Sequence, residues 1–221
     1  MAGGVEAALA AGTQDVAALA PGDGLAIDLG AGFGMHAIPL ARAGYDVLAL
    51  DTSRELLDVL RANSAGLTIR AVEADLLDFR RNASAHAALI VCMGDTLTHL
   101  AAPEDVERLA HDVAASLKPG GRFVATFRDY TKPGTGDARF IPVRSDANRI
   151  HTCFLEEQPD HMLVHDIVHE RDGATWRMRV SSYPKLRLAP AAVAETLRYV
   201  GLEPTVAPGA RGMVRITASK P

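Results

Sequence analysis

A carboxylate and a run of alternating glycines follow an apolar stretch in segment 24–34, which reads Gly-Leu-Ala-Ile-Asp-Leu-Gly-Ala-Gly-Phe-Gly. The apolar residues on both sides of Asp28 are typical of a strand buried in a parallel sheet. Gly30, Gly32 and Gly34 allow the backbone to turn sharply and to approach a ligand closely before a helix begins. This order of elements predicts a site for a nucleotide-type cofactor.

Two more aspartates, Asp51 and Asp75, follow later apolar runs, and a further run ends at Cys92. In a parallel sheet, ligands bind beyond the carboxyl ends of the strands, where the strand order reverses. We therefore expect these aspartates and the residues after Cys92 to converge on the glycine turn. A carboxylate at the position of Asp51 can accept hydrogen bonds from both hydroxyls of a ribose.

The elements that must position these residues follow from the apolar periodicity. Short aliphatic runs alternate with amphipathic ones, which indicates a parallel sheet flanked by helices; we expect strands at about 25–29, 46–50, 68–72, 87–92 and 121–127, and helices at about 13–19, 34–43, 53–64 and 103–117. After Tyr130 the period falls to two, which predicts antiparallel hairpins. Their strands are expected at about 139–144, 148–158, 161–171 and 174–188, followed by a helix at 190–200 and a strand pair at 202–207 and 213–218.

The composition limits the classes of protein to consider. With 221 residues, 48% of them hydrophobic, the chain suits one α/β domain with an insertion. A formal net charge of −4 gives no general attraction for nucleic acid. Two cysteines make no disulfide framework, no apolar run is long enough to span a bilayer, and we do not expect the alanine-rich N-terminal segment to be a signal peptide. We expect a cytoplasmic protein that acts on neither nucleic acid nor a membrane.

Four motifs occur together: Asp-Leu-Gly-Ala-Gly-Phe-Gly from residue 28, the strand-end Asp51, Ala-Asp-Leu from residue 74, and Leu-Lys-Pro-Gly-Gly-Arg from residue 117. In combination they resemble the class I S-adenosylmethionine-dependent methyltransferases. The resemblance implies a Rossmann-like seven-stranded sheet, mostly parallel with the last strand antiparallel, with helices on both faces and the hairpins inserted after the fifth strand. It also implies S-adenosyl-L-methionine as the cofactor.

The resemblance implies a role for each residue near the turn. The loop amides approach the methionine and ribose parts, Asp28 holds the loop or attracts the cofactor's amino group, and Asp75 faces the adenine with Leu76 against the ring. Two simpler alternatives stay open, since Asp51 could be a solvated strand-end residue and Asp75 the cap of the following turn. The predicted cofactor set is Asp28, Gly30, Ala31, Gly32, Gly34, Asp51, Thr52, Asp75, Leu76, Cys92, Met93 and Gly94.

The division of the chain follows from the same resemblance. We expect a single methyltransferase domain over 1–221, with a mobile start at 1–12, a cofactor-binding core at 24–127, a β insertion over the acceptor site at 130–188, and a C-terminal helix and strand pair at 189–221. Because little chain precedes the first strand, we expect the hairpins or a second subunit to cover the site. The second possibility favours a homodimer.

Two segments, 92–100 and 127–130, resemble the glycine and sarcosine N-methyltransferase group. That group has a Gly-Asn-Ser sequence ending in His-Leu and an Arg-Asn-Tyr sequence at these places. Asp95 and Asp129 stand where the group has asparagine, so the acceptor is left open.

Methyl transfer from a sulfonium is a one-step displacement that needs alignment rather than a covalent intermediate or a metal. An amine acceptor must be unprotonated, and a phenol or alcohol benefits from a general base, for which His99 and Asp95 are nearest in sequence. Arg128 at a strand end can hold an acceptor carboxylate through two hydrogen bonds. Alternatively, His99 is structural and Arg128 is an exposed partner of Asp129. We predict transfer to nitrogen or oxygen of a small molecule, with His99, Asp95 and Arg128 as catalytic residues.

The wall of the acceptor site is expected to come from Arg128, Tyr130, Trp176, Arg179 and Tyr183. Trp176 and Tyr183 also have the spacing of ordinary strand-pair residues.

The segment His165-Asp166-Ile167-Val168-His169 nearly matches the zinc-binding pattern His-Glu-x-x-His, and His161 precedes it by four residues. That pattern needs a helix, whereas the alternation here indicates a strand, so we expect no metal.

Two other classes of function stay open. One is a non-catalytic methyltransferase-like regulator, which would have no need of the intact glycine turn with Asp51 and Asp75. The other is an NAD-dependent oxidoreductase, which Met35 disfavours because a dinucleotide fingerprint has glycine at that position.

Overall fold

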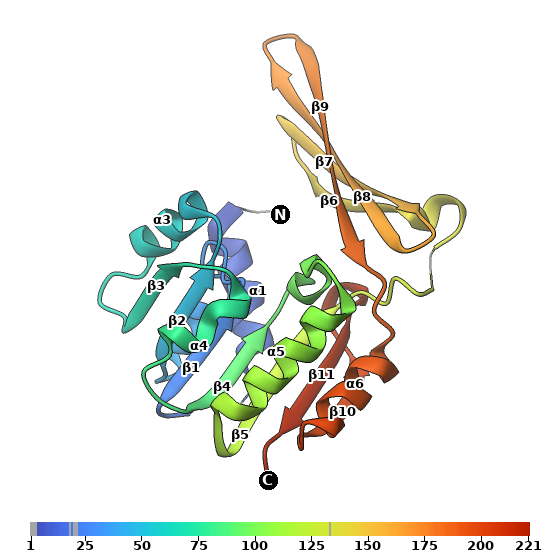
Figure 1. Ribbon diagram of the computed structural model, residues 1–221. Coiled ribbons are helices and arrows are strands. Elements are labelled where there is room, and N and C mark those ends of the chain that lie inside the picture. Colours follow the sequence, from blue (N-terminus) through green and yellow to red (C-terminus); the bar gives the residue numbers. More distant parts are fainter. Residues whose placement is uncertain (1–3, 18, 20–21, 133) are drawn as a thin grey trace.

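The computed structural model describes residues 4–17, 19, 22–132 and 134–221. Its main sheet has the strand order β10-β11-β5-β4-β1-β2-β3 (Figure 1). The strands are β1 Leu25–Leu29, β2 Asp46–Asp51, β3 Ile69–Glu73, β4 Ala87–Cys92, β5 Leu117–Phe127, β10 Glu203–Pro208 and β11 Val214–Ser219. β1 to β5 run parallel, whereas β11 is antiparallel to both β5 and β10. The predicted fold class is confirmed.

Helices cover both faces of the main sheet because successive strand residues point to opposite faces. The helices are α1 Gly4–Ala17, α2 Ala37–Arg42, α3 Arg54–Asn63, α4 Phe79–Asn82, α5 Pro103–Ser116 and α6 Pro190–Tyr199. Ile27 and Leu29 of β1 pack into one apolar cluster with α5 and α6, whereas Ala26 joins a second cluster with α1, α2 and α3. No helix in the described residues is long and apolar enough to cross a membrane.

The helix starts show the local chemistry that the sequence indicates. The Ser53 hydroxyl accepts a hydrogen bond from the Leu56 N–H at the start of α3, and Pro103 occupies the first turn of α5. α2 begins at Ala37, later than the predicted 34, because the glycine turn continues to His36.

A second sheet of four antiparallel strands projects from the carboxyl edge of the main sheet (Figure 1). Its strands are β6 Phe140–Ser145, β7 Arg149–Glu157, β8 His161–Asp172 and β9 Thr175–Leu186. At its base, Leu155, Met162 and Val164 pack against Tyr130, which follows β5. The predicted insertion of hairpins after the fifth strand is therefore confirmed.

The N-terminal segment differs from expectation. We predicted a helix over about 13–19 after a mobile start, whereas α1 begins at Gly4; residues 1–3 lie outside the described part of the chain. A side chain on Gly12 would collide with the Met35 carbonyl group, so α1 lies directly against the end of the glycine turn. The division into domain parts stays a prediction.

Candidate functional site

The three glycines of the turn have different neighbours. All three have positive φ, which favours glycine. A Cβ on Gly30 would lie 2.4 Å from Thr96 Cγ2, and one on Gly34 would lie 2.9 Å from Leu60 Cγ, so these two glycines permit close packing. A Cβ on Gly32 would meet only Leu56 Cδ1, at 3.9 Å. Gly32 is therefore the glycine that leaves open space for a ligand.

The backbone amides of the turn have internal partners, which differs from the expectation that they face the cofactor. The N–H groups of Gly30 and Ala31 donate to the Leu50 carbonyl, at 2.9 and 2.8 Å. The Gly32 N–H donates to Asp51 Oδ2 at 2.7 Å, and the Ser53 N–H donates to Asp51 Oδ1 at 2.8 Å. Asp51 thus fixes the turn, and each of its oxygens retains a lone pair for a further donor such as a ribose hydroxyl.

A cavity of about 600 Å³ lies beside the turn, within the size range of small-ligand sites. Asp75 Oδ1 accepts the Leu77 N–H at 2.8 Å, so the capping role that we kept as an alternative is present, while the residue still faces the cavity. Six predicted cofactor residues line it: Gly30, Gly32, Asp51, Thr52, Asp75 and Leu76. We refer to it as the donor cavity.

Asp28 lies beneath the turn with its side chain almost completely buried. Its Oδ2 is the buried side-chain oxygen that lacks a hydrogen-bond partner among the described residues. Burial raises the pKa of this carboxyl to about 6, although the nearby His36 opposes the rise. Asp28 does not line the donor cavity, so its contact with the amino group of S-adenosylmethionine stays a prediction, whereas the open cavity suits the nucleoside part of that cofactor.

The remaining predicted cofactor residues do not line the donor cavity. Ala31 and Cys92 are buried in the core, and Gly34 packs on α2 and α3. Burial raises the pKa of the Cys92 thiol far above its usual range, as expected for a wall residue. Met93 is also buried, and its carbonyl accepts the Thr96 hydroxyl at 2.8 Å. Gly94 lines a second cavity instead.

This second cavity, of about 490 Å³, lies between the carboxyl edge of the main sheet, α1 and the second sheet. We refer to it as the acceptor cavity. Ala7, Ala8 and Ala11 of α1 line it, so the N-terminal helix contributes cover that we expected only from hairpins or a second subunit. Its other lining residues are Met35, Gly94, Asp95, His99, Arg128, Tyr130, Ile141, Val143, Cys153, Leu155, Val164, Tyr183, Lys185, Arg211 and Met213.

Asp95 is at the centre of a buried network that joins the two sheets. Its Oδ1 accepts the Arg128 N–H at 2.9 Å, and its Oδ2 accepts both the Tyr130 hydroxyl at 2.7 Å and an N–H of the Lys185 ammonium group. Burial lowers the pKa of Lys185, against the opposing effect of Asp95. These donors occupy the carboxylate of Asp95, so it suits positioning better than proton abstraction.

His99 lines both the donor and the acceptor cavity. Its ring packs on the Tyr183 ring with the centroids 5.3 Å apart. Burial, together with the charge of Lys185, lowers the pKa of its imidazole, which favours the neutral form. A neutral imidazole between the two cavities can accept a proton.

Arg128 faces the acceptor cavity with its guanidinium free for a ligand. None of the ion pairs in the described residues includes Arg128. Asp129, the partner in the alternative interpretation, instead pairs with Lys132 at 3.6 Å. The geometry thus favours the ligand-binding interpretation of Arg128 over the surface ion pair.

The predicted wall residues separate into two sets. Tyr130 and Tyr183 line the acceptor cavity. Trp176 and Arg179 do not, because they lie far along β9 where the hairpin projects beyond the cavity; Trp176 is opposite Arg171, and Arg179 pairs with Glu170. Trp176 and Arg179 are therefore not part of the wall of the acceptor cavity.

The comparisons with known proteins agree with this geometry. Residues 26–121 match a family described as a methyltransferase domain. This match supports the predicted membership of the class I S-adenosylmethionine-dependent methyltransferases over residues 26–121. The predicted cofactor, S-adenosylmethionine, is the one used by this family.

Three similar proteins illustrate the family. A cypemycin N-terminal methyltransferase from Streptomyces sp is 35% identical over 133 residues, which cover 57% of this chain and 51% of that protein. A glycine/sarcosine N-methyltransferase from Halorhodospira halochloris is 29% identical over 106 residues, covering 47% and 40%. The structure of CalS10 with bound S-adenosylmethionine, from Micromonospora echinaspora, shares the fold with a TM-score of 0.79 at 16% identity, covering 96% of this chain and 90% of that one. The chain spans about half or less of the length of these two curated relatives.

Proposed function

We propose that the protein transfers a methyl group from S-adenosylmethionine to a nitrogen atom of a small acceptor that carries a carboxylate. The observation that carries this proposal is the position of His99, which lines a donor cavity on one side and an acceptor cavity on the other. A direct displacement needs the nucleophile, the methyl carbon and the sulfur in line, and two cavities that meet at one side chain suit that arrangement.

S-adenosylmethionine supplies an electrophilic methyl group on a positively charged sulfur. Around it, Asp51 holds the glycine turn and presents its remaining lone pairs to the donor cavity. Neutral His99 accepts the proton that the acceptor loses, and Asp95 fixes Tyr130 and the backbone at Arg128. In this assignment His99 is the base and Asp95 is a positioning residue.

Two observations favour nitrogen over oxygen and an acidic acceptor over a neutral one. The two curated relatives described above are named as N-methyltransferases, and CalS10 is described as an amino pentose methyltransferase. Arg128 offers the acceptor cavity a guanidinium with no carboxylate partner in the described residues. A guanidinium binds a carboxylate through two parallel hydrogen bonds.

The experiment is a screen of amines, amino acids, phenols and carboxylates, with S-adenosylhomocysteine formation as the readout. Each amino acid is paired with its amide, which keeps the amine and removes the carboxylate. We expect Arg128→Gln to raise KM for the acid by roughly tenfold to a hundredfold and to leave the amide unchanged. Arg179→Gln is the matched control, since Arg179 lies outside the cavity. A preference for neutral apolar acceptors would contradict the role of Arg128.

The two alternative classes are separated by calorimetric titration. A regulator that retains the fold binds S-adenosylmethionine without forming product in any screen, whereas an oxidoreductase binds NAD more tightly.

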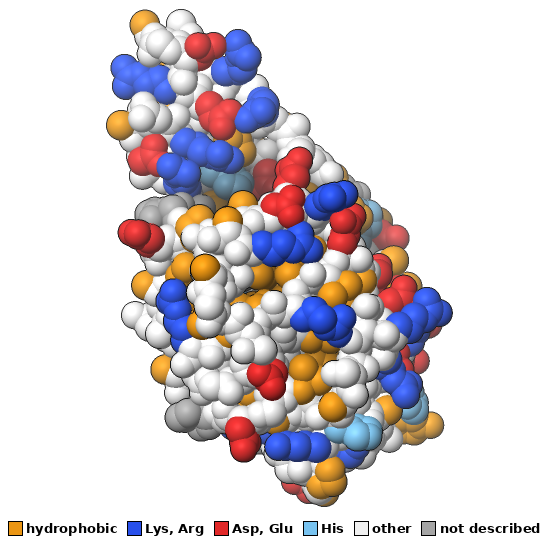
Figure 2. Space-filling model, turned by 90° about the vertical axis from the view of Figure 1, so that its left-hand side faces the viewer, with side chains coloured by type: hydrophobic (Ala, Val, Ile, Leu, Met, Phe, Trp, Pro, Cys, Tyr) orange, Lys and Arg blue, Asp and Glu red, His pale blue; other side chains and the backbone are white. Residues whose placement is uncertain are grey.

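Three further expectations from sequence stand as proposals: a cytoplasmic location, no nucleic-acid or membrane partner, and a homodimer. Basic and acidic side chains are interspersed over the projecting sheet in Figure 2, which supports the absence of a polyanion partner.

A further inference from the structure

Three side chains with metal-binding atoms meet on the second sheet. His151 and Cys153 are two residues apart on β7 and therefore share one face of the strand, and Asp166 of β8 is directly opposite Cys153. Asp166 Oδ1 lies 2.7 Å from His151 Nε2 and 3.0 Å from Cys153 Sγ, and the sulfur lies 4.0 Å from the same imidazole nitrogen.

We propose that His151, Cys153 and Asp166 bind a late first-row divalent metal ion such as zinc, with its open coordination position toward the acceptor cavity. Zinc bonds of ~2.0 Å to nitrogen and oxygen and ~2.3 Å to sulfur, at tetrahedral angles, place the ligand atoms roughly 3.3 to 3.6 Å apart. Each of the three observed separations is within about 0.6 Å of that range, so rotation of the side chains is enough to close the site.

The chemistry of the donors selects the class of ion. Thiolate and imidazole favour zinc, cobalt or copper over magnesium or calcium. One thiolate and one carboxylate also neutralise a divalent ion, so the bound site carries no net charge in a half-buried position, with side-chain exposures of 19% for His151 and 23% for Asp166. Tyr183 of β9 lies on the same face of the second sheet as Asp166, because Asp166 is opposite Ser181 and Tyr183 follows two residues later.

The residues that line the acceptor cavity indicate the direction of the free coordination position on the metal ion. Cys153 and Tyr183 both face the acceptor cavity, and the three ligands leave a tetrahedral ion one free position. A nitrogen or oxygen atom of a ligand in that cavity can fill it.

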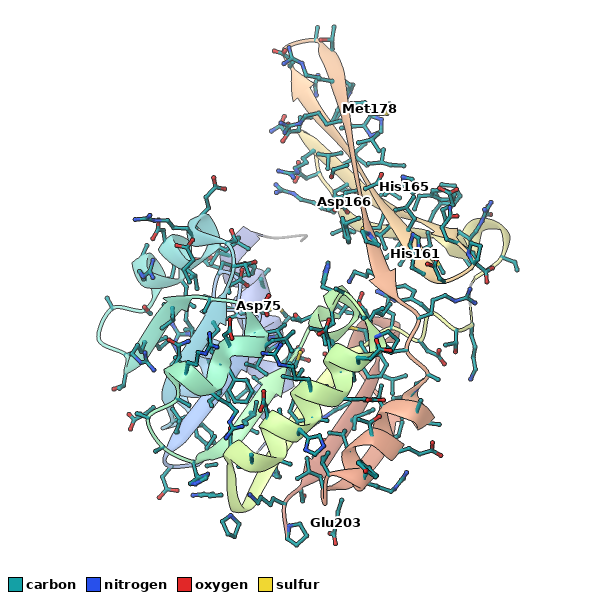
Figure 3. The ribbon with its side chains drawn as sticks, viewed as in Figure 1. Asp75, His161, His165, Asp166, Met178 and Glu203 are labelled. Atoms are coloured by element: carbon teal, nitrogen blue, oxygen red, sulfur yellow. The ribbon has the colours of Figure 1, made fainter. Side chains whose placement is uncertain are left out.

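The near match to the zinc pattern in the sequence pointed to different residues. His165 and His169 of β8 alternate with Asp166 and so lie on the other face of the sheet. Figure 3 labels His165 and Asp166, which are consecutive on β8. His165 pairs there with Glu156 at 2.8 Å. The strand structure excludes the linear motif but brings Asp166 to two residues of the neighbouring strand.

The test is titration of the full-length protein, stripped of metal and kept reduced, with Co²⁺. We expect one equivalent to bind with a thiolate-to-cobalt charge-transfer band and visible bands typical of a tetrahedral site, and Zn²⁺ to displace it. Cys153→Ser should remove the charge-transfer band, and Asp166→Asn should weaken binding at least roughly tenfold. His169→Ala is the matched control on the other face of β8 and should leave the titration unchanged.

Two results would overturn the proposal: wild-type protein that binds no cobalt, or a charge-transfer band that survives in Cys153→Ser. The cobalt titration of the wild-type protein needs no variant, so its result is valid even if a substitution disturbs folding. Circular dichroism monitors the folding of each variant. The readout is independent of the proposed methyl transfer, because it requires neither S-adenosylmethionine nor an acceptor.

Discussion

The buried carboxylate of Asp28 offers a quantitative test of the donor site. Burial raises its pKa from 3.8 to about 6, and one of its oxygens has no hydrogen-bond partner in the described residues. A difference of about two pH units corresponds to ~3 kcal/mol of folding free energy. The pKa of Asp28 is higher in the folded state than in the unfolded state. The contribution of Asp28 to the free energy of unfolding is therefore fully present below pH 3.8 and is lost as the pH rises through about 6.

Asp28→Asn removes the charge and keeps the shape of the side chain. The stability of the variant relative to wild type should increase by up to ~3 kcal/mol between about pH 4 and pH 7. For a chain of this length that is a relative rise in Tm of roughly 6 to 12 °C. Urea unfolding followed by circular dichroism at both pH values measures the change. Because the variant is compared with wild type at each pH, any effect of the new amide on stability that does not depend on pH cancels.

We expect the same substitution to weaken S-adenosylmethionine binding roughly tenfold or more, because Asp28 is the predicted partner of the cofactor's amino group. Asp46→Asn is the matched control, since Asp46 is exposed at the start of β2. A stability difference that does not vary with pH, or cofactor affinity equal to wild type, would refute the reasoning about Asp28.

The remaining predictions concern the two cavities and their cover. Asp51→Ala should abolish calorimetric binding of S-adenosylmethionine, because it removes the acceptor of the Gly32 and Ser53 amides; affinity within threefold of wild type would contradict this. His99→Gln should lower kcat roughly 10²- to 10⁴-fold and remove the acidic limb of the pH–rate profile, which the lowered pKa of His99 places on the acid side of the ordinary histidine range; an unchanged limb would assign it to another group. Lys185→Met should lower the free energy of unfolding by ~3 to 5 kcal/mol because it leaves the Asp95 charge buried and unpaired, whereas a loss below ~1 kcal/mol in urea unfolding would show that the pair is solvated.

Local rules made the main sheet and the donor cavity predictable. Parallel strands end at a common edge, so aspartates placed directly after apolar runs had to converge once the strands were recognised. Asp51 and Asp75 lie where this rule puts them, beside Gly32. The four strands of the insertion were also predictable, because turn residues interrupt a period-two pattern.

The acceptor side was less predictable because it depends on contacts between distant segments. Lys185 reaches Asp95 from 90 positions further along the chain, and no local pattern in the sequence specifies that contact. The length of the β8–β9 hairpin, which carries Trp176 beyond the cavity, is set by the register of a projecting sheet. The cover from α1 depends on a backbone contact at Gly12, for which an alanine-rich segment gives little signal.

Lys185 explains how this chain accommodates aspartate at position 95, where the glycine and sarcosine N-methyltransferase group has asparagine. Asp95 has a φ of 76°, a left-handed conformation that asparagine and aspartate tolerate better than most residues. Aspartate in place of asparagine therefore keeps the turn after β4 but adds a buried negative charge, and Lys185 neutralises that charge from β9 of the insertion. The pair joins the main sheet to the second sheet at the acceptor cavity, so a change at either residue alters both the folding of the insertion and the position of Tyr130. We expect acceptor specificity and insertion stability to change together in this chain, whereas the donor cavity, which neither residue lines, should retain its cofactor affinity.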